Sequence, residues 1–342
     1  PDFLVAKWRV TRLRQMEGAD QPDQFVDELM KVDLSGLTPR ERFFIEYWRA
    51  GRNNQPEEEA RLLDECVKAS PDDPYILDRK ARVAWIKRDF DTADDLLQEV
   101  LERDLNWVTA YNMLGYIKME QGRFKEAEEH FKSYRFIAPD QANPHDSLGE
   151  LYITVGRYTE AEATLNRAIE IKEDFWASYL HLAIMFAYRG DFDAVERVVD
   201  RGRGAGMPDE VLFGMECRAR YAELADRGAW RQVFDERDSK CVSGFENVLA
   251  AIATHRAACH LGEWETAMAI GEEAEEILAA AEKSGNDETI LSFGPVIPHL
   301  QGVRNAIEGK LDAAEERIRV SDELLTFMGA DPAMTKLYNR LL

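Results

Sequence analysis

The feature that most constrains this chain is a 34-residue pattern that occurs twice in succession between Asn106 and Glu173. Apolar, small and aromatic residues return at matching positions in the two copies. The first copy holds Tyr111, Leu114, Gly115, Gly122, Phe124, Ala127, Phe131 and Pro139, and the second holds His145, Leu148, Gly149, Gly156, Tyr158, Ala161 and Leu165. Each copy predicts a helix, a tight turn and a second helix, with small residues where the two helices touch. Because one such pair cannot bury its own apolar face, a period of this length indicates a stacked array.

The same period extends well beyond these two copies. A slot that closes the second helix of each unit is occupied, at equal steps, by Pro71, Leu105, Pro139, Glu173 and Met207. Thr38 is a good N-cap for a helix that starts at Pro39, and Glu41 is placed to complete a capping box. Further turn signals follow at Gly228, Gly262 and Gly309, with more than one standard period between the last two. The helices in this later part are therefore expected to be longer.

These signals predict an all-α fold, a right-handed α-α superhelix of about nine helix pairs with a C-terminal capping helix. We expect a degenerate N-terminal helix pair over residues 1–34, a regular array over 35–207, and an irregular array over 208–342. In the last region, the cap is expected at Asp331–Leu342.

A glycine string interrupts the regular pattern. Gly202, Gly204 and Gly206, followed by Pro208, predict a longer link between helices. Glycines at every second position also occur in phosphate-binding loops. Such a loop requires a preceding strand, whereas the residues before Gly202 are predicted to end a helix. We therefore expect a helix-terminating linker here and no nucleotide site.

The Leu-Gly pair, the Gly-x-aromatic turn, the alanine and the proline, at this spacing, resemble the tetratricopeptide repeat. The resemblance implies a helical scaffold in which the first helix of each repeat lines a concave groove, where protein or peptide segments dock. Residues 37–46 and 142–152 also resemble stretches of the repeat regions of bacterial multidomain regulators. The start at Pro1, without a methionine, would suit the C-terminal region of such a regulator.

Residues about four apart on the first helices share one face, so the groove lining can be predicted. It comprises Asp78, Arg82, Trp85, Asn112, Tyr116, Met119, Asp146, Glu150, His181 and Tyr188, with Ile153 and Ile184 between them. Tyrosine, tryptophan, methionine and arginine are enriched at interface cores, which favours protein or peptide binding. The alternative is that any helix face without a packed neighbour has such a composition.

Family members that clamp an acidic C-terminal tail use lysine and asparagine on this face. Here Asp78, Asp146 and Glu150 occupy the matching positions, and Asn112 is the residue that fits. The resemblance therefore implies a partner segment with basic or mixed character. A formal net charge of −22 disfavours nucleic acid and anionic membrane surfaces as partners.

The sequence offers no constellation of side chains for catalysis. His255 and Cys259 lie four apart on one predicted helix face, which is a conceivable edge of a metal site, but no further ligands follow at fixed spacing. We interpret Cys259 as a core cysteine beside an incidental histidine, and we predict a non-enzymatic protein with no cofactor and no metal.

The four cysteines are far apart in the sequence and lack metal-site spacing. Cys66, Cys217, Cys241 and Cys259 are expected to be core residues or free thiols. This favours a reducing compartment, so we expect a cytoplasmic protein. The start at Pro1 leaves an extracytoplasmic location open.

The leading hypothesis is a non-enzymatic scaffold that binds a protein or peptide segment in its groove, as the interaction or regulatory part of a larger assembly. The alternative is a small-molecule-sensing regulatory domain, with a pocket in the half beyond Gly206 and long helices around Trp264 and Phe293. Homo-oligomerisation through Trp8 or the C-terminal cap is a third possibility.

Overall fold

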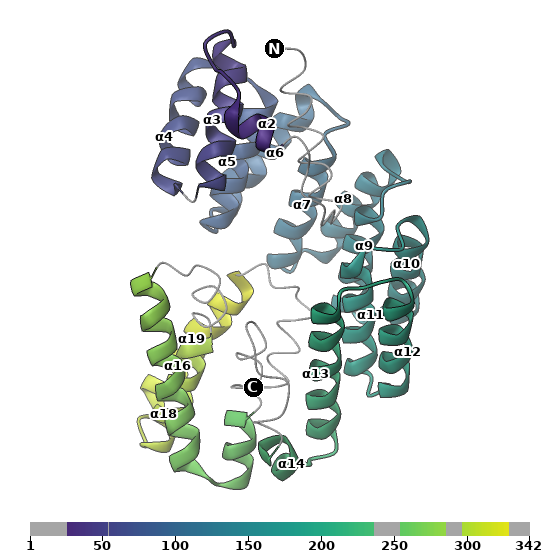
Figure 1. Cartoon of the computed structure of the whole chain (residues 1–342), viewed down its shortest axis with the longest axis vertical. Coiled ribbons are helices and arrows are strands. Elements are labelled where there is room, and N and C mark those ends of the chain that lie inside the picture. Colours follow the sequence, from purple (N-terminus) through teal and green to yellow (C-terminus); the bar gives the residue numbers. More distant parts are fainter. Residues whose placement is uncertain (1–25, 54, 236–253, 285–295, 328–342) are drawn as a thin grey trace. The chain divides into compact units, whose positions relative to one another are not determined.

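The computed structural model describes residues 26–53, 55–235, 254–284 and 296–327 (Figure 1). Within these ranges the chain forms helices joined by turns, and it contains no strand. The predicted all-α class is therefore confirmed. Residues 1–25 of the predicted N-terminal helix pair, with Trp8, lie outside the described residues, as do Phe293 and the cap predicted at Asp331–Leu342.

The helices follow one another in pairs along the chain. Their bounds are α2 (Val26–Lys31), α3 (Pro39–Arg52), α4 (Pro56–Ala69), α5 (Pro74–Ile86), α6 (Phe90–Arg103), α7 (Val108–Glu120), α8 (Phe124–Ile137), α9 (Asn143–Thr154), α10 (Tyr158–Ile171), α11 (Trp176–Tyr188), α12 (Phe192–Gly204), α13 (Asp209–Asp226), α14 (Trp230–Asp235), α16 (Trp264–Ser284), α18 (Val296–Ile307) and α19 (Leu311–Phe327). Residues 254–261 are also helical.

The contacts within the chain divide it into two compact units. Described residues up to Leu151, together with Asn166–Phe175, belong to the first unit, and Tyr152–Leu165 with the described residues from Trp176 onward belong to the second. The three regions expected from the sequence were defined by the regularity of the repeat and not by contacts, so that division stays a prediction.

The helix start predicted at Thr38 is confirmed. The Thr38 hydroxyl accepts a hydrogen bond from the Glu41 backbone N–H, and the Glu41 carboxylate accepts one from the Thr38 backbone N–H at 2.9 Å. Two N–H groups that the first turn of α3 leaves without a helical partner are thereby satisfied. Pro39 occupies the first helical position, where no N–H is needed.

Glycine closes the turn inside most helix pairs because the backbone there is left-handed. Gly122 has a φ of 71° and Gly156 a φ of 79°, a region that a side chain disfavours. Arg88 occupies the same slot between α5 and α6 with a φ of 59°. The turn between α5 and α6 therefore keeps the same left-handed geometry without the glycine.

Close contact between paired helices explains the recurring small residues. In α7, a Cβ added at Gly115 would lie 2.3 Å from the Phe131 ring on α8, and Phe131 is itself fully buried. Ala127 and Ala161, at matching positions of two second helices, are also fully buried. The prediction that small residues mark the helix contacts is confirmed for these positions.

The longer link expected at the glycine string is wrong. Gly202 and Gly204 belong to α12, and the connection to α13 is the short turn 205–208. Gly202 is instead a packing position, because a Cβ there would lie 2.8 Å from Cε of Met207. Some helices beyond this turn are longer, as predicted: α13 has 18 residues and α16 has 21, against 13 or 14 in α5 to α8. The prediction fails for α18, which has 12 residues.

The cysteines do not all behave as expected. Cys66 and Cys259 are free, whereas Cys217 is disulfide-bonded. The expectation of free thiols is therefore wrong for Cys217, because its sulfur is covalently paired. Cys241 lies outside the described residues.

Candidate functional site

The predicted groove residues of the first unit lie on first helices that pack against their neighbours, with α5 against α7. Asp78 of α5 is only 1% exposed. Its carboxylate accepts hydrogen bonds from Trp107 Nε1 at 3.0 Å and from the Thr109 hydroxyl at 2.9 Å, and it forms an ion pair with Arg79. Asp78 thus joins α5 to the start of α7, one repeat further on.

The aromatic residues of the predicted face also join successive repeats. The rings of Trp85 and Tyr116 are stacked, with centroids 6.4 Å apart and planes inclined by 20°. Trp85 Nε1 donates to Glu120 at 3.0 Å, and the Tyr116 hydroxyl donates to Glu150 at 2.8 Å. Both rings are half-buried, so part of this stacked pair is accessible to solvent.

Ser147 completes this network between α7 and α9. Its hydroxyl donates to Asn112 Oδ1 at 3.0 Å and lies 3.2 Å from the hydroxyl of Tyr116, whose single hydrogen is directed to Glu150. Burial and the nearby carboxylates of Glu150 and Asp146 raise the pKa of Tyr116 well above its usual value. The phenol is therefore neutral and remains a hydrogen-bond donor at physiological pH.

Exposure separates the predicted residues into two groups. Asp78, Met119, Asp146 and Glu150 are buried, and the last two are 3% and 4% exposed. Arg82 is exposed, and Trp85, Asn112 and Tyr116 are half-buried. On α11, in the second unit, His181 is buried and Tyr188 is half-buried.

The sequence prediction missed Trp107, Thr109, Glu120 and Ser147, which supply donors and acceptors to the predicted residues. Each lies 29 to 35 residues from its partner, which is about one repeat. These hydrogen-bond partners could therefore have been found by searching for polar side chains about one repeat away from each predicted groove residue.

A second candidate site lies in the second unit, around residues 254–261, α16, α18 and α19. It is a cleft of about 580 Å³, lined by His255, Arg256, Cys259, His260, Trp264, His299, Val303, Ala306, Ile307 and Ile318. Burial lowers the pKa of both His255 and His299 to about 4, so both imidazoles are neutral at pH 7.

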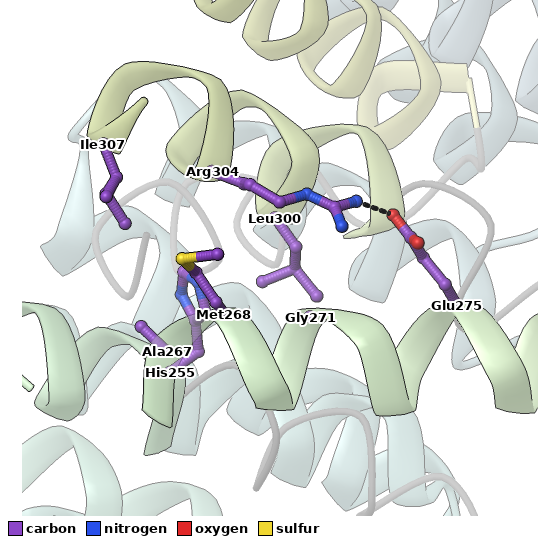
Figure 2. A pocket seen from close by; sticks show the side chains of 8 residues that line it. All are labelled: His255, Ala267, Met268, Gly271, Glu275, Leu300, Arg304 and Ile307. Carbon is purple, nitrogen blue, oxygen red and sulfur yellow. Dashed lines mark hydrogen bonds and ion pairs between the residues drawn. The ribbon is translucent and has the colours of Figure 1, made fainter. Parts of the chain in front are cut away.

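The packing of α16 against α18 lies beside this cleft and shares His255 and Ile307 with it. Figure 2 shows Leu300 of α18 pointing towards Gly271 of α16, and Arg304 extending along α18 to form an ion pair with Glu275. The space between these side chains has no room for a water molecule. The interface between α16 and α18 is therefore close-packed next to the cleft.

The histidine and cysteine singled out in the sequence do lie together here. The Sγ atom of Cys259 is 3.9 Å from Nδ1 of His255. Burial raises the pKa of the Cys259 thiol, which disfavours the thiolate that a metal would need. Among the described residues, no group of three or more potential ligands is placed to hold a metal ion.

Paired helices, left-handed turns at a fixed slot, and hydrogen bonds that connect residues one period apart define a helical repeat protein. Residues 108–174 match the family model described as tetratricopeptide repeat. These residues therefore form tetratricopeptide repeats.

Several known proteins share this similarity. The chain is 26% identical over 171 residues to the TPR repeat-containing protein PA4667 of Pseudomonas aeruginosa, a match that covers 49% of this chain and 29% of the relative. It is 20% identical to the RNA polymerase-associated protein CTR9 of Caenorhabditis elegans, over 96% of this chain and 29% of that protein. The chain thus spans less than a third of either relative.

A solved tetratricopeptide repeat protein from Parabacteroides merdae shares the fold. The TM-score is 0.53 at 16% identity, and the match covers 74% of this chain and 99% of the other. In the described part of the chain, no helix combines the length and apolar character needed to cross a membrane.

Proposed function

We propose that this protein is a non-enzymatic scaffold that docks a protein or peptide segment on the groove face of its first helices. The observation that carries the proposal is the half-buried stack of Trp85 and Tyr116, which spans two successive repeats. Aromatic side chains of this kind supply large contact area at low entropic cost. The exposed Arg82 and the half-buried Asn112 extend the accessible surface beside the stack.

The hydrogen bonds between repeats support this role because they fix the surface in advance. Ser147 of α9 contacts both Tyr116 and Asn112 of α7. A ligand would therefore meet side chains that are already ordered. A preorganised surface reduces the entropy lost on binding. Replacement of a network residue would disturb both binding and stability, so the informative variants are at exposed positions.

We further propose that the docked segment carries basic residues. Asp146 and Glu150 are buried just beneath the face, and carboxylates in a region of low dielectric constant project a stronger field than exposed ones. Their role is to attract a basic segment through this potential, while the exposed side chains make the contacts.

The test is quantitative capture of partner proteins on the intact chain and on two charge-swap variants. Arg82→Glu changes an exposed residue of the face, and Lys132→Glu makes the same charge change on α8, a second helix. For a basic segment on the face, Arg82→Glu strengthens capture severalfold and Lys132→Glu leaves it unchanged. Equal effects of the two variants would reject the face, and weakened capture with Arg82→Glu would reject the basic partner.

A second function, small-molecule sensing by the C-terminal half, is favoured by a specific observation. The cleft beside Trp264 has a volume in the range of ligand pockets, about 300–1,000 Å³. Its lining also mixes apolar side chains with a few polar ones. We propose it as the sensing site of a scaffold whose docking face is elsewhere.

A further inference from the structure

The chemistry of the cleft in the second unit restricts what it can bind. Val303, Ala306, Ile307 and Ile318 supply an apolar wall from α18 and α19. The neutral imidazoles of His255 and His299 each carry one donor and one acceptor, and Nδ1 of His255 faces Sγ of Cys259. Such a lining suits a ligand with an apolar body and a small number of polar atoms.

Charge supplies the second restriction. The described residues that line the cleft include the cation Arg256 and no aspartate or glutamate, although the chain has 65 acidic residues against 43 lysines and arginines. The nearby Glu263 forms an ion pair with Arg231. The described part of the lining is therefore free of carboxylates in a strongly acidic chain, and beside it an anion avoids the repulsion that acts elsewhere.

Arg256 is held in place by aromatic contacts. Its guanidinium lies over the Trp230 ring at 5.0 Å from the centroid, and the same ring stacks on His260 at 4.0 Å with planes inclined by 2°. Because Arg256 and His260 are one helical turn apart, Trp230 of α14 orders both side chains along the cleft. A planar ligand could extend this row of aromatic faces.

We propose that the cleft between residues 254–261, α16 and α18 binds a small organic anion with an aromatic body. The ring packs against the apolar wall and near Trp264, and the carboxylate lies towards Arg256. This proposal does not depend on the docking face, which lies on other helices.

Three naphthalene probes test the charge preference on the full chain, without any variant. Isothermal titration calorimetry compares 1-naphthoate, the neutral 1-naphthamide and the cationic 1-naphthylmethylammonium. The proposal expects naphthoate to bind at least tenfold more tightly than the amide, and the cation more weakly than either. Absent binding of naphthoate, or equal affinity for the acid and the amide, would overturn it.

Three variants then test the location. Ala306→Trp fills the cleft from an exposed position, and Arg256→Gln removes the cation. Phe136→Ser removes a side chain that is 87% exposed on α8 and serves as a control for binding to apolar surface elsewhere. We expect Ala306→Trp to weaken naphthoate at least tenfold, Arg256→Gln to reduce its affinity to that of the amide, and Phe136→Ser to change nothing.

Circular dichroism establishes whether each variant is folded. An unfolded variant is set aside, and the comparison of the three probes on the unaltered chain still decides the charge preference. Retained affinity in a folded Ala306→Trp variant, or a loss in Phe136→Ser, would place the ligand outside the cleft and overturn the proposal.

Discussion

The hydroxyl of Tyr116 donates a hydrogen bond of 2.8 Å to Oε2 of Glu150, which lies 34 residues further along the chain. The separation equals the repeat period, so the bond joins one first helix to the next. The same residue pair was predicted to contact a partner protein. In the structure, the carboxylate of Glu150 is engaged by its neighbouring repeat and is 4% exposed, and contact of the pair with a partner stays a prediction.

Replacing Tyr116 with phenylalanine should destabilise the protein because Glu150 loses a donor while it stays buried. The expected loss in unfolding free energy is about 1–3 kcal/mol. Tyr111→Phe serves as the control, since the contact of the Tyr111 ring with His130 does not require the hydroxyl. Urea unfolding followed by circular dichroism measures both, and equal losses would contradict the role assigned to this bond.

A methyl group at Gly115 should be poorly tolerated. The Phe131 ring lies where the new Cβ would be, and overpacking of a core typically costs about 1–3 kcal/mol or more. Gly36→Ala, at an exposed position with no atom within 4 Å of the added carbon, should change stability by less than about 0.5 kcal/mol. A Gly115→Ala variant as stable as Gly36→Ala would mean that the two helices are not in such close contact.

Gly122→Ala tests the backbone of the turn and not its packing. Nothing lies within 4 Å of the added carbon, but φ is +71°, where an L side chain costs about 1–2 kcal/mol. At Arg88, a side chain already occupies the left-handed region, so Arg88→Gly would relieve this backbone strain but would also remove the ion pair with Glu120. Thermal unfolding should show a lower melting temperature for Gly122→Ala, and an unchanged one would argue against the left-handed turn.

Stability of the C-terminal unit should fall in acid. The folded pKa values of His255 and His299, about 4, are below the usual value of 6.5, so the unfolded chain binds more protons between these limits. Stability from these two groups is therefore full above about pH 6.5 and is lost as the pH falls towards 4. The melting temperature should fall less between pH 7 and pH 5 in His255→Gln than in the unaltered chain. Equal falls would show that the imidazole of His255 titrates normally.

Much of the fold could be predicted because its determinants are local and periodic. The cap at Thr38, the turn at Gly122 and the helix contact at Gly115 each depend on a residue type at a fixed place in the repeat. The short turn after Gly204 could not be predicted, because the packing of Gly202 against Met207 depends on a neighbour folding back onto the helix. A glycine required by packing and a glycine required by a turn look the same in a sequence.

The candidate site was harder to predict. Helical spacing places Asp78, Tyr116 and Glu150 on one face, but it does not give the donors that each acquires from the next repeat. The cleft joins His255, Trp264 and His299, which are separated by irregular helices without a period. Its shape depends on the packing of those helices, and that information is not carried by any motif.

The most direct test of the docking face is site-specific photocrosslinking in the intact protein. A benzoylphenylalanine at position 82, which is exposed on α5, is compared with one at position 132, which is exposed on α8. The account predicts a discrete adduct with one partner at position 82, competed by that partner's purified segment, and none at position 132. Adducts of equal yield at both positions, or an adduct at position 132 alone, would contradict it.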